Sequence, residues 1–90
     1  MKRLRLRIYG AVQGVVFRAS AKKKAGELGL HGFVRNCEDG CVETEVEGEE
    51  DAIQQYRVWC REGPMWAKVE RVEEELHDQL VGYRKFDIRY

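Results

Sequence analysis

The chain has one proline, two histidines and three cysteines among its 90 residues, and it lacks a long hydrophobic run. A membrane-spanning helix needs about 20 consecutive apolar residues, so we expect no membrane partner. A signal peptide needs an unbroken apolar stretch, whereas residues 2–7 alternate basic residues with leucine, so we expect a cytoplasmic protein. The chain has no C-x-x-C or H-x-x-x-H pair, the spacings typical of a zinc site, so we expect no metal.

The formal net charge is zero, with 16 basic and 16 acidic residues, which argues against a nucleic-acid partner. The charges are unevenly distributed, however. Residues 1–35 hold nine bases and one acid, and residues 36–83 hold fourteen acids and four bases. Two interpretations remain open: the basic third attracts an anion, or its charges pair with the acidic middle of the chain.

Hydrophobic periodicity predicts a strand, a helix, two strands, a second helix and two further strands. A change in alternation between Val69 and Val72 predicts a bulge or bend in the fourth strand, and the last strand is expected at an edge. The expected strands cover residues 3–9, 30–37, 42–47, 67–76 and 84–90, and the expected helices cover residues 17–28 and 48–62.

This order predicts an α+β fold, the ferredoxin-like βαββαβ sandwich, as a single domain over residues 1–90. Its antiparallel sheet carries two helices on one face and gains an extra C-terminal strand. The first and third strands are neighbours in this topology, so their charged side chains should form exposed pairs of small energetic weight. These side chains are Arg3, Arg5 and Arg7 in the first strand and Glu43, Glu45 and Glu47 in the third.

A loop with two glycines joins the first strand to the first helix, over residues 10–16. Glycine lets backbone amides approach a ligand, a helix N-terminus carries partial positive charge, and Arg18 adds a planar guanidinium. These features together predict a site for a tetrahedral oxyanion such as phosphate. The alternative is a tight turn followed by a surface arginine. No GxSxG elbow, Walker loop or Cys/His catalytic pair competes with this loop.

Two separated motifs in this chain resemble those of the acylphosphatase family. The run from Gly10 to Arg18, G-A-V-Q-G-V-V-F-R, resembles the family signature. Residues 28–36, L-G-L-H-G-F-V-R-N, and residues 39–43, D-G-C-V-E, resemble its second motif. Shorter similarities follow, so that the resemblance covers essentially the whole chain; they lie at residues 46–48, 63–69 and 86–89.

The resemblance implies an enzyme that hydrolyses the carboxyl-phosphate bond of acyl phosphates without a metal or organic cofactor. It implies phosphate binding by Arg18 and the loop amides, with Gln13 shaping the turn, and it makes Arg18 and Asn36 the catalytic residues. The resemblance implies that the Asn36 amide orients the attacking water. The motif offers no histidine or carboxylate as a base, so the water would pass its proton to the substrate's own phosphoryl oxygen. The implied phosphate-binding residues are Gly14, Val15, Val16, Phe17 and Arg18.

The implied partners are a small-molecule acyl phosphate and, as competitive ligands, inorganic phosphate or sulfate. We expect a monomer. Val16 departs from the family pattern, in which glycine or an aromatic residue is common at this position. Asn36 has an alternative interpretation as an asparagine at a hairpin end that satisfies local backbone groups.

Two other protein classes are weighed against this interpretation. An RNA-recognition module shares the element order but needs aromatic side chains on the exposed faces of its first and third strands, where this chain has arginines and glutamates. An acylphosphatase-like domain of a larger hydrogenase-maturation carbamoyltransferase has a similar loop. The sequence stops just after its fifth strand, so we expect a free-standing enzyme.

Cysteine and tryptophan give two further expectations. Cys37 and Cys41 flank a three-residue turn, and a disulfide between them is the alternative to the free thiols normal in a cytosolic protein. Trp59 and Trp66 are expected to lie in the core or to be partly buried.

Overall fold

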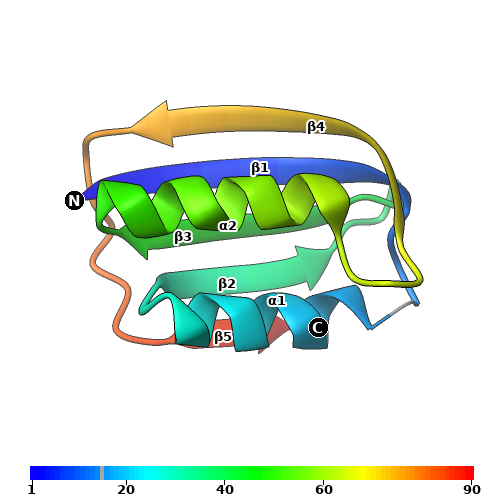
Figure 1. The fold of residues 1–90 in the computed structure, drawn as a ribbon, viewed down its shortest axis with the longest axis horizontal. Helices are drawn as coiled ribbons and strands as arrows, with labels where there is room; N and C mark the ends of the chain where they lie inside the picture. The colour runs from blue at the N-terminus through cyan, green and yellow to red at the C-terminus, as the bar shows by residue number, and fades with distance from the viewer. Residues whose placement is uncertain (15) are drawn as a thin grey trace.

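The computed structural model describes residues 1–14 and 16–90 (Figure 1). The predicted order of helices and strands is confirmed, with boundaries within three residues of those expected. The elements are β1 (Lys2–Ala11), α1 (Phe17–Glu27), β2 (His31–Asn36), β3 (Val42–Gly48), α2 (Glu50–Glu62), β4 (Lys68–His77) and β5 (Phe86–Arg89).

The strands form one sheet in the order β4-β1-β3-β2-β5. β1 pairs antiparallel with β3 and β4, and β2 pairs antiparallel with β3. β5 lies at an edge, as expected, but it runs parallel to β2, so the sheet is mixed and not wholly antiparallel. The cause is the connection between β4 and β5, which follows the end of the sheet where β4 finishes and β2 begins (Figure 1).

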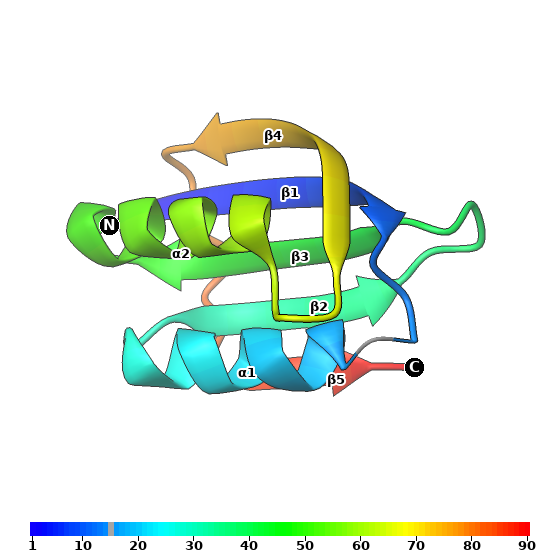
Figure 2. The same ribbon diagram turned by 45° about the vertical axis from the view of Figure 1, so that its right-hand side comes forward.

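Both helices cover the same face of the sheet, as the predicted sandwich requires (Figure 2). On this face the alternation of β1 buries Leu4, Leu6 and Ile8 completely. Burial of a large apolar side chain contributes about 1.5–3 kcal/mol, so this face is the main support of the fold. The helices add six buried side chains to the same cluster: Phe17, Ala21 and Ala25 from α1, and Ile53, Tyr56 and Cys60 from α2.

The opposite face carries charges that are buried, which corrects the prediction of exposed pairs. Glu43 is only 2% exposed. It accepts hydrogen bonds from Arg5 Nε at 2.9 Å, Arg7 Nε at 3.2 Å and Arg35 Nε at 2.7 Å. Burial by itself raises the pKa of the Glu43 carboxyl, but the hydrogen bonds from Arg5 and Arg35 outweigh burial and hold this pKa below its ordinary value.

The connection over residues 78–85 covers the other two glutamates of β3. The Tyr83 hydroxyl donates a hydrogen bond to Glu45, and the backbone amides of residues 81–83 donate to Glu47. Burial and the bond to Glu45 raise the pKa of Tyr83 to about 12. The prediction of exposure was wrong because alternation shows which face a side chain lies on and does not show what covers that face.

A bulge bends β4 where β1 leads into the loop. Tyr9 pairs with Arg71 and Gly10 pairs with Val69, so Glu70 is the extra residue, and the bulge expected between Val69 and Val72 is confirmed. Gly10 has φ 131°, and a Cβ on it would lie 2.1 Å from the Lys68 carbonyl oxygen. Only glycine fits this close approach, so the glycine that opens the loop has a structural reason.

The two tryptophans differ in burial. Trp59 is partly buried and packs edge-on against Phe17, with ring centroids 5.4 Å apart, as expected. Trp66 is 76% exposed, and its expected burial is wrong, because it lies in the turn beyond the end of α2. Within the described residues, neither helix combines the length and apolar character that a membrane crossing requires.

Candidate functional site

A pocket of about 300 Å³ opens at the end of the sheet where β1 leads into α1. It brings together three parts of the chain that are distant in sequence: the loop with the first turn of α1, the end of β2 and the end of β5. Val15, an expected phosphate-binding residue, lies outside the described residues. The pocket is lined by Val12, Gly14, Val16, Phe17, Arg18, Ala19, Asn36, Ile88 and Tyr90.

The loop enters the helix through residues with left-handed backbone conformations, Gly14 at φ 73° and Val16 at φ 54°. α1 begins at Phe17, and no side chain among the described residues caps it through a hydrogen bond. The first amides of a helix have no partner within the helix, and they lie at its positive end. The start of α1 therefore presents donors that suit a phosphate group.

Gln13 ties the loop to the turn between β2 and β3. Its Nε2 donates hydrogen bonds to the carbonyl oxygens of Cys37 at 2.9 Å and Cys41 at 2.8 Å. Each bond leads to a backbone atom, so the position of the loop depends on the hairpin backbone and not on a mobile side chain. The loop is thereby held beside Asn36, the last residue of β2.

Arg18 lies half-buried on the first turn of α1. Its Nη1 donates a hydrogen bond to the Arg89 carbonyl oxygen at 3.2 Å, and its Cζ lies 4.7 Å from the centroid of the Tyr90 ring. Three other arginines share Glu43, whereas no carboxylate of the described residues lies within ion-pair distance of Arg18. Pairing with the acidic middle thus accounts for the arginines of β1 and β2, and Arg18 keeps its charge available for an anion.

Asn36 is half-buried and faces the same pocket as Arg18. In the adjacent turn, Gln13 donates to the backbone carbonyls of Cys37 and Cys41, and the Cys41 amide donates to Asp39. The Asn36 side-chain amide makes no hydrogen bond to any described residue. The structure therefore gives no support to the interpretation of Asn36 as a residue that satisfies local backbone groups. Its amide is available to a ligand or a water molecule.

The sequence interpretation missed the contribution of the last strand. The parallel pairing of β5 with β2 sets Arg89 beside Arg35, one residue before Asn36. The Arg89 carbonyl and the Tyr90 ring thereby come to hold the Arg18 guanidinium. The alternation of residues 84–90 did predict a strand, but alternation does not predict which strand of the sheet it pairs with.

The pocket lining offers no cysteine, histidine or carboxylate among the described residues that could hold a metal. A group that could do so, Cys37 with Asp39 and Cys41, lies outside the pocket at the turn between β2 and β3. The chemistry available in the pocket is therefore that of backbone amides, one guanidinium and one side-chain amide.

Comparisons with known proteins agree in sequence and in structure. A family model described as Acylphosphatase matches residues 4–88. An acylphosphatase from Roseiflexus sp. is 52% identical over 88 residues, which is 98% of this chain and 95% of the relative. The crystal structure of acylphosphatase from Bacillus subtilis has a TM-score of 0.97 at 34% identity and covers 100% of both chains. The crystal structure of T. kodakarensis HypF has a TM-score of 0.85 at 30% identity, covering 100% of this chain and 12% of that one.

Proposed function

This chain belongs to the acylphosphatase family, and from this premise we propose how its residues hydrolyse the carboxyl-phosphate bond of an acyl phosphate. The observation that carries the proposal is the pocket that brings together Arg18, the start of α1 and Asn36. Within residues 1–14 and 16–90, Arg18 has no carboxylate partner, no side chain caps α1, and the Asn36 amide makes no hydrogen bond. Arg18 and the loop amides bind the phosphoryl group. Asn36 orients the attacking water.

Binding rests on charge-assisted hydrogen bonds to the phosphoryl oxygens. The Arg18 fork takes two of these oxygens, and the amides of residues 14–18 surround the others. The Arg89 carbonyl and the Tyr90 ring restrict the guanidinium before the substrate arrives, so less side-chain freedom is lost on binding. Inorganic phosphate and sulfate share this tetrahedral geometry, and they compete with the substrate.

The chemical step needs positioning and electrostatic stabilisation more than it needs acid catalysis, because the leaving group is a carboxylate. Water held by Asn36 forms the new bond to phosphorus while the bond to the acyl oxygen breaks. The proton of the attacking water passes to a phosphoryl oxygen of the substrate itself. The products are a carboxylate and inorganic phosphate, and the charge that develops on phosphoryl oxygens is met by Arg18 and the loop amides.

The alternative of an RNA-recognition module finds no specific observation in its favour among the described residues. The face of β1 and β3 that an RNA-recognition module would use carries the buried glutamates with their arginines, and the Tyr9 ring beside them is covered by Arg71, whose Cζ lies 4.1 Å from its centroid. The similarity to HypF covers 100% of this chain and 12% of that protein, and a free-standing enzyme stays a prediction. The monomeric state and the cytoplasmic location expected from the sequence stay predictions.

The test is the hydrolysis of benzoyl phosphate by the wild type and by variants of the two site residues. Arg18→Ala should lose both turnover and phosphate inhibition, and Arg18→Lys should fail as well, because an ammonium does not reproduce the guanidinium fork. Asn36→Ala should lower kcat by about two orders of magnitude while KM and the phosphate inhibition constant change little. Lys23→Ala, which removes an exposed charge from the same helix, is the control and should behave as wild type.

Two outcomes would contradict these roles. Near-normal kcat/KM in Arg18→Lys would show that the arginine is not the phosphate clamp. Near-normal kcat in Asn36→Ala, or a loss of activity that merely follows unfolding at the assay temperature, would remove Asn36 from the reaction. A chelator should leave the wild-type rate unchanged, since the pocket lining supplies no metal ligand among the described residues.

A further inference from the structure

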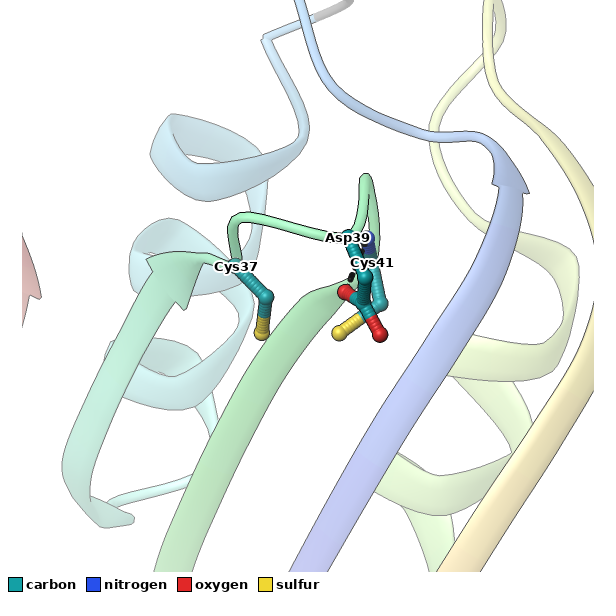
Figure 3. A group of neighbouring side chains, drawn as sticks. All are labelled: Cys37, Asp39 and Cys41. Atoms are coloured by element: carbon teal, nitrogen blue, oxygen red, sulfur yellow. Dashed lines mark hydrogen bonds between the residues drawn. The ribbon is translucent and has the colours of Figure 1, made fainter.

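The turn between β2 and β3 brings together two cysteines and an aspartate that the proposed reaction does not use. The sulfur atoms of Cys37 and Cys41 and a carboxylate oxygen of Asp39 all lie within 4.8 Å of one another. Figure 3 shows the three side chains projecting to the same side of the hairpin. We propose that Cys37, Asp39 and Cys41 bind one thiophilic divalent cation of the zinc class.

The backbone of the turn sets this arrangement before any cation arrives. The Cys37 amide donates a hydrogen bond to the Cys41 carbonyl at 2.8 Å, so the two cysteines face each other across the hairpin. The Gly40 amide donates to the Cys37 carbonyl at 3.2 Å and closes the turn between them. Zn–S bonds of about 2.3 Å place two bound sulfurs roughly 3.8 Å apart, so small side-chain rotations bring the thiols into range.

The ligand set selects the class of cation. Two sulfurs and one carboxylate oxygen suit zinc and similar thiophilic ions, whereas magnesium and calcium require oxygen ligands. Three protein ligands leave a fourth position for water in a tetrahedral site. The sequence excluded a metal because C-x-x-C was absent, but the three residues between Cys37 and Cys41 also fall within the spacing of zinc ligands, about two to four residues.

A cation must displace a proton from each thiol, and the raised pKa of Cys41 opposes this step. Cys41 is fully buried, and burial, with hydrogen bonds to Cys37 and Asp39, raises the pKa of its thiol. The hydrogen bond from the Cys41 amide lowers the pKa of Asp39, which is therefore already ionised at neutral pH. On binding, each thiol exchanges its proton for a bond to the cation, and two protons pass to solvent.

The charge of the loaded site is balanced by its neighbours. Two thiolates and one carboxylate carry three negative charges, so a divalent cation leaves one in excess. Arg7 of β1 and Arg35 of β2 lie close enough to interact electrostatically with Cys41 and Cys37, respectively. Both guanidiniums also bind Glu43, so they are held on the same face of the sheet as the cluster.

Cobalt provides a direct test, because its thiolate complexes absorb in the near ultraviolet and the visible. The reduced, chelator-treated wild type should bind one Co²⁺ per chain, show thiolate charge-transfer and tetrahedral bands, and release the ion to Zn²⁺. Cys37→Ser and Cys41→Ser should each abolish the charge-transfer band, and Asp39→Asn should weaken binding by roughly tenfold or more. Cys60→Ala is the matched control and should keep the full spectrum, because Cys60 lies on the buried face of α2 and does not belong to the cluster.

A second measurement needs no variant. Zn²⁺ should slow the alkylation of Cys37 in the wild type many-fold and leave the reactivity of Cys60 unchanged. Absence of a thiolate band while all three thiols are reduced would overturn the proposal. So would a band that survives Cys37→Ser, or a Cys37–Cys41 disulfide that persists in reductant and consumes both ligands. Benzoyl phosphate hydrolysis is measured separately, because loss of that activity in the wild type would contradict the proposed function and not the cation site.

Discussion

Val16 occupies a backbone conformation that a β-branched residue rarely adopts, with φ 54° and ψ 26° immediately before α1. Left-handed conformations of such residues cost about 1–3 kcal/mol. The Val16 side chain is 65% exposed, so apolar burial offsets little of this cost. The strain lies in the segment whose amides we assign to phosphate binding.

Val16→Gly should therefore raise the free energy of unfolding by about 1 kcal/mol. Glycine relieves the left-handed strain, and its greater freedom in the unfolded chain removes roughly 0.5–1 kcal/mol of that gain. The measurement is equilibrium denaturation in urea.

The matched control for this change is Val81→Gly. Val81 is 61% exposed and is not among the residues with positive φ, so this substitution should lower stability. Equal losses in the two variants would show that Val16 is not strained.

At this scale the sequence predicted the residues of the site better than their supports. Arg18 and Asn36 belong to motifs, and the structure brings both to one pocket. No motif of the sequence predicted that the Arg89 carbonyl and the Tyr90 ring would contact Arg18. The exposure of Trp66 was also unpredictable, because a large apolar side chain carries no sign that the turn holding it lies outside the core.

At the scale of elements, the side chains on the two faces of β3 are buried by different parts of the molecule. Its apolar side chains pack under the helices, and its glutamates are covered by arginines and by residues 78–85. Alternation predicted both faces of this strand correctly. Alternation could not predict that the glutamates are buried. Arginine side chains of β1 and β2 bind Glu43, and residues 78–85, which show no alternation, cover Glu45 and Glu47.

Glu43→Gln should destabilise the fold by about 2 kcal/mol at pH 7, since it leaves three arginines without their shared carboxylate. The pKa of Glu43 is lower in the folded state than the ordinary value near 4.3 of the unfolded chain, so its contribution to stability is complete above that value. As the pH falls through the folded-state pKa, the carboxylate becomes protonated and the contribution is lost. The gap between wild type and variant should therefore close in acid.

Urea denaturation between pH 7 and pH 3 measures this gap. Glu62→Gln, at an exposed position near the end of α2, serves as the control and should show little difference from wild type throughout. A gap between wild type and Glu43→Gln that stays constant over the whole range would mean that the arginines do not depend on the charge of Glu43.

At the scale of the whole molecule, the pocket joins the loop after β1, the start of α1, the end of β2 and the end of β5. These parts come together only when the sheet is complete, so a ligand of the pocket binds the folded state and not the unfolded chain. The element order could be predicted because each element has its own periodicity. The parallel direction of β5 could not, because it depends on the path of residues 78–85 around the sheet.

Inorganic phosphate should consequently raise the melting temperature. At a concentration of about 100 times Kd, linkage predicts about 2.7 kcal/mol of stabilisation, which is roughly 10 °C or more for a domain of this size. Differential scanning fluorimetry with phosphate, against chloride at matched ionic strength, measures the shift. Arg18→Ala should lose most of it. An equal shift in that variant would place the bound anion elsewhere.

β4 ends the sheet on one side, so one row of its backbone amides and carbonyls has no strand beside it. Such a row is a template for amyloid-like growth by addition of another chain. The bulge at Glu70 bends this template, and the exposed side chains of Glu73 and Glu75 add negative charge to it, whereas Glu74 pairs with Arg57 and Arg61 of α2. When the β4 edges of two molecules approach each other, their carboxylates repel one another. This protection depends on ionised carboxylates, so acid that neutralises them removes the barrier to intermolecular β-pairing at this edge.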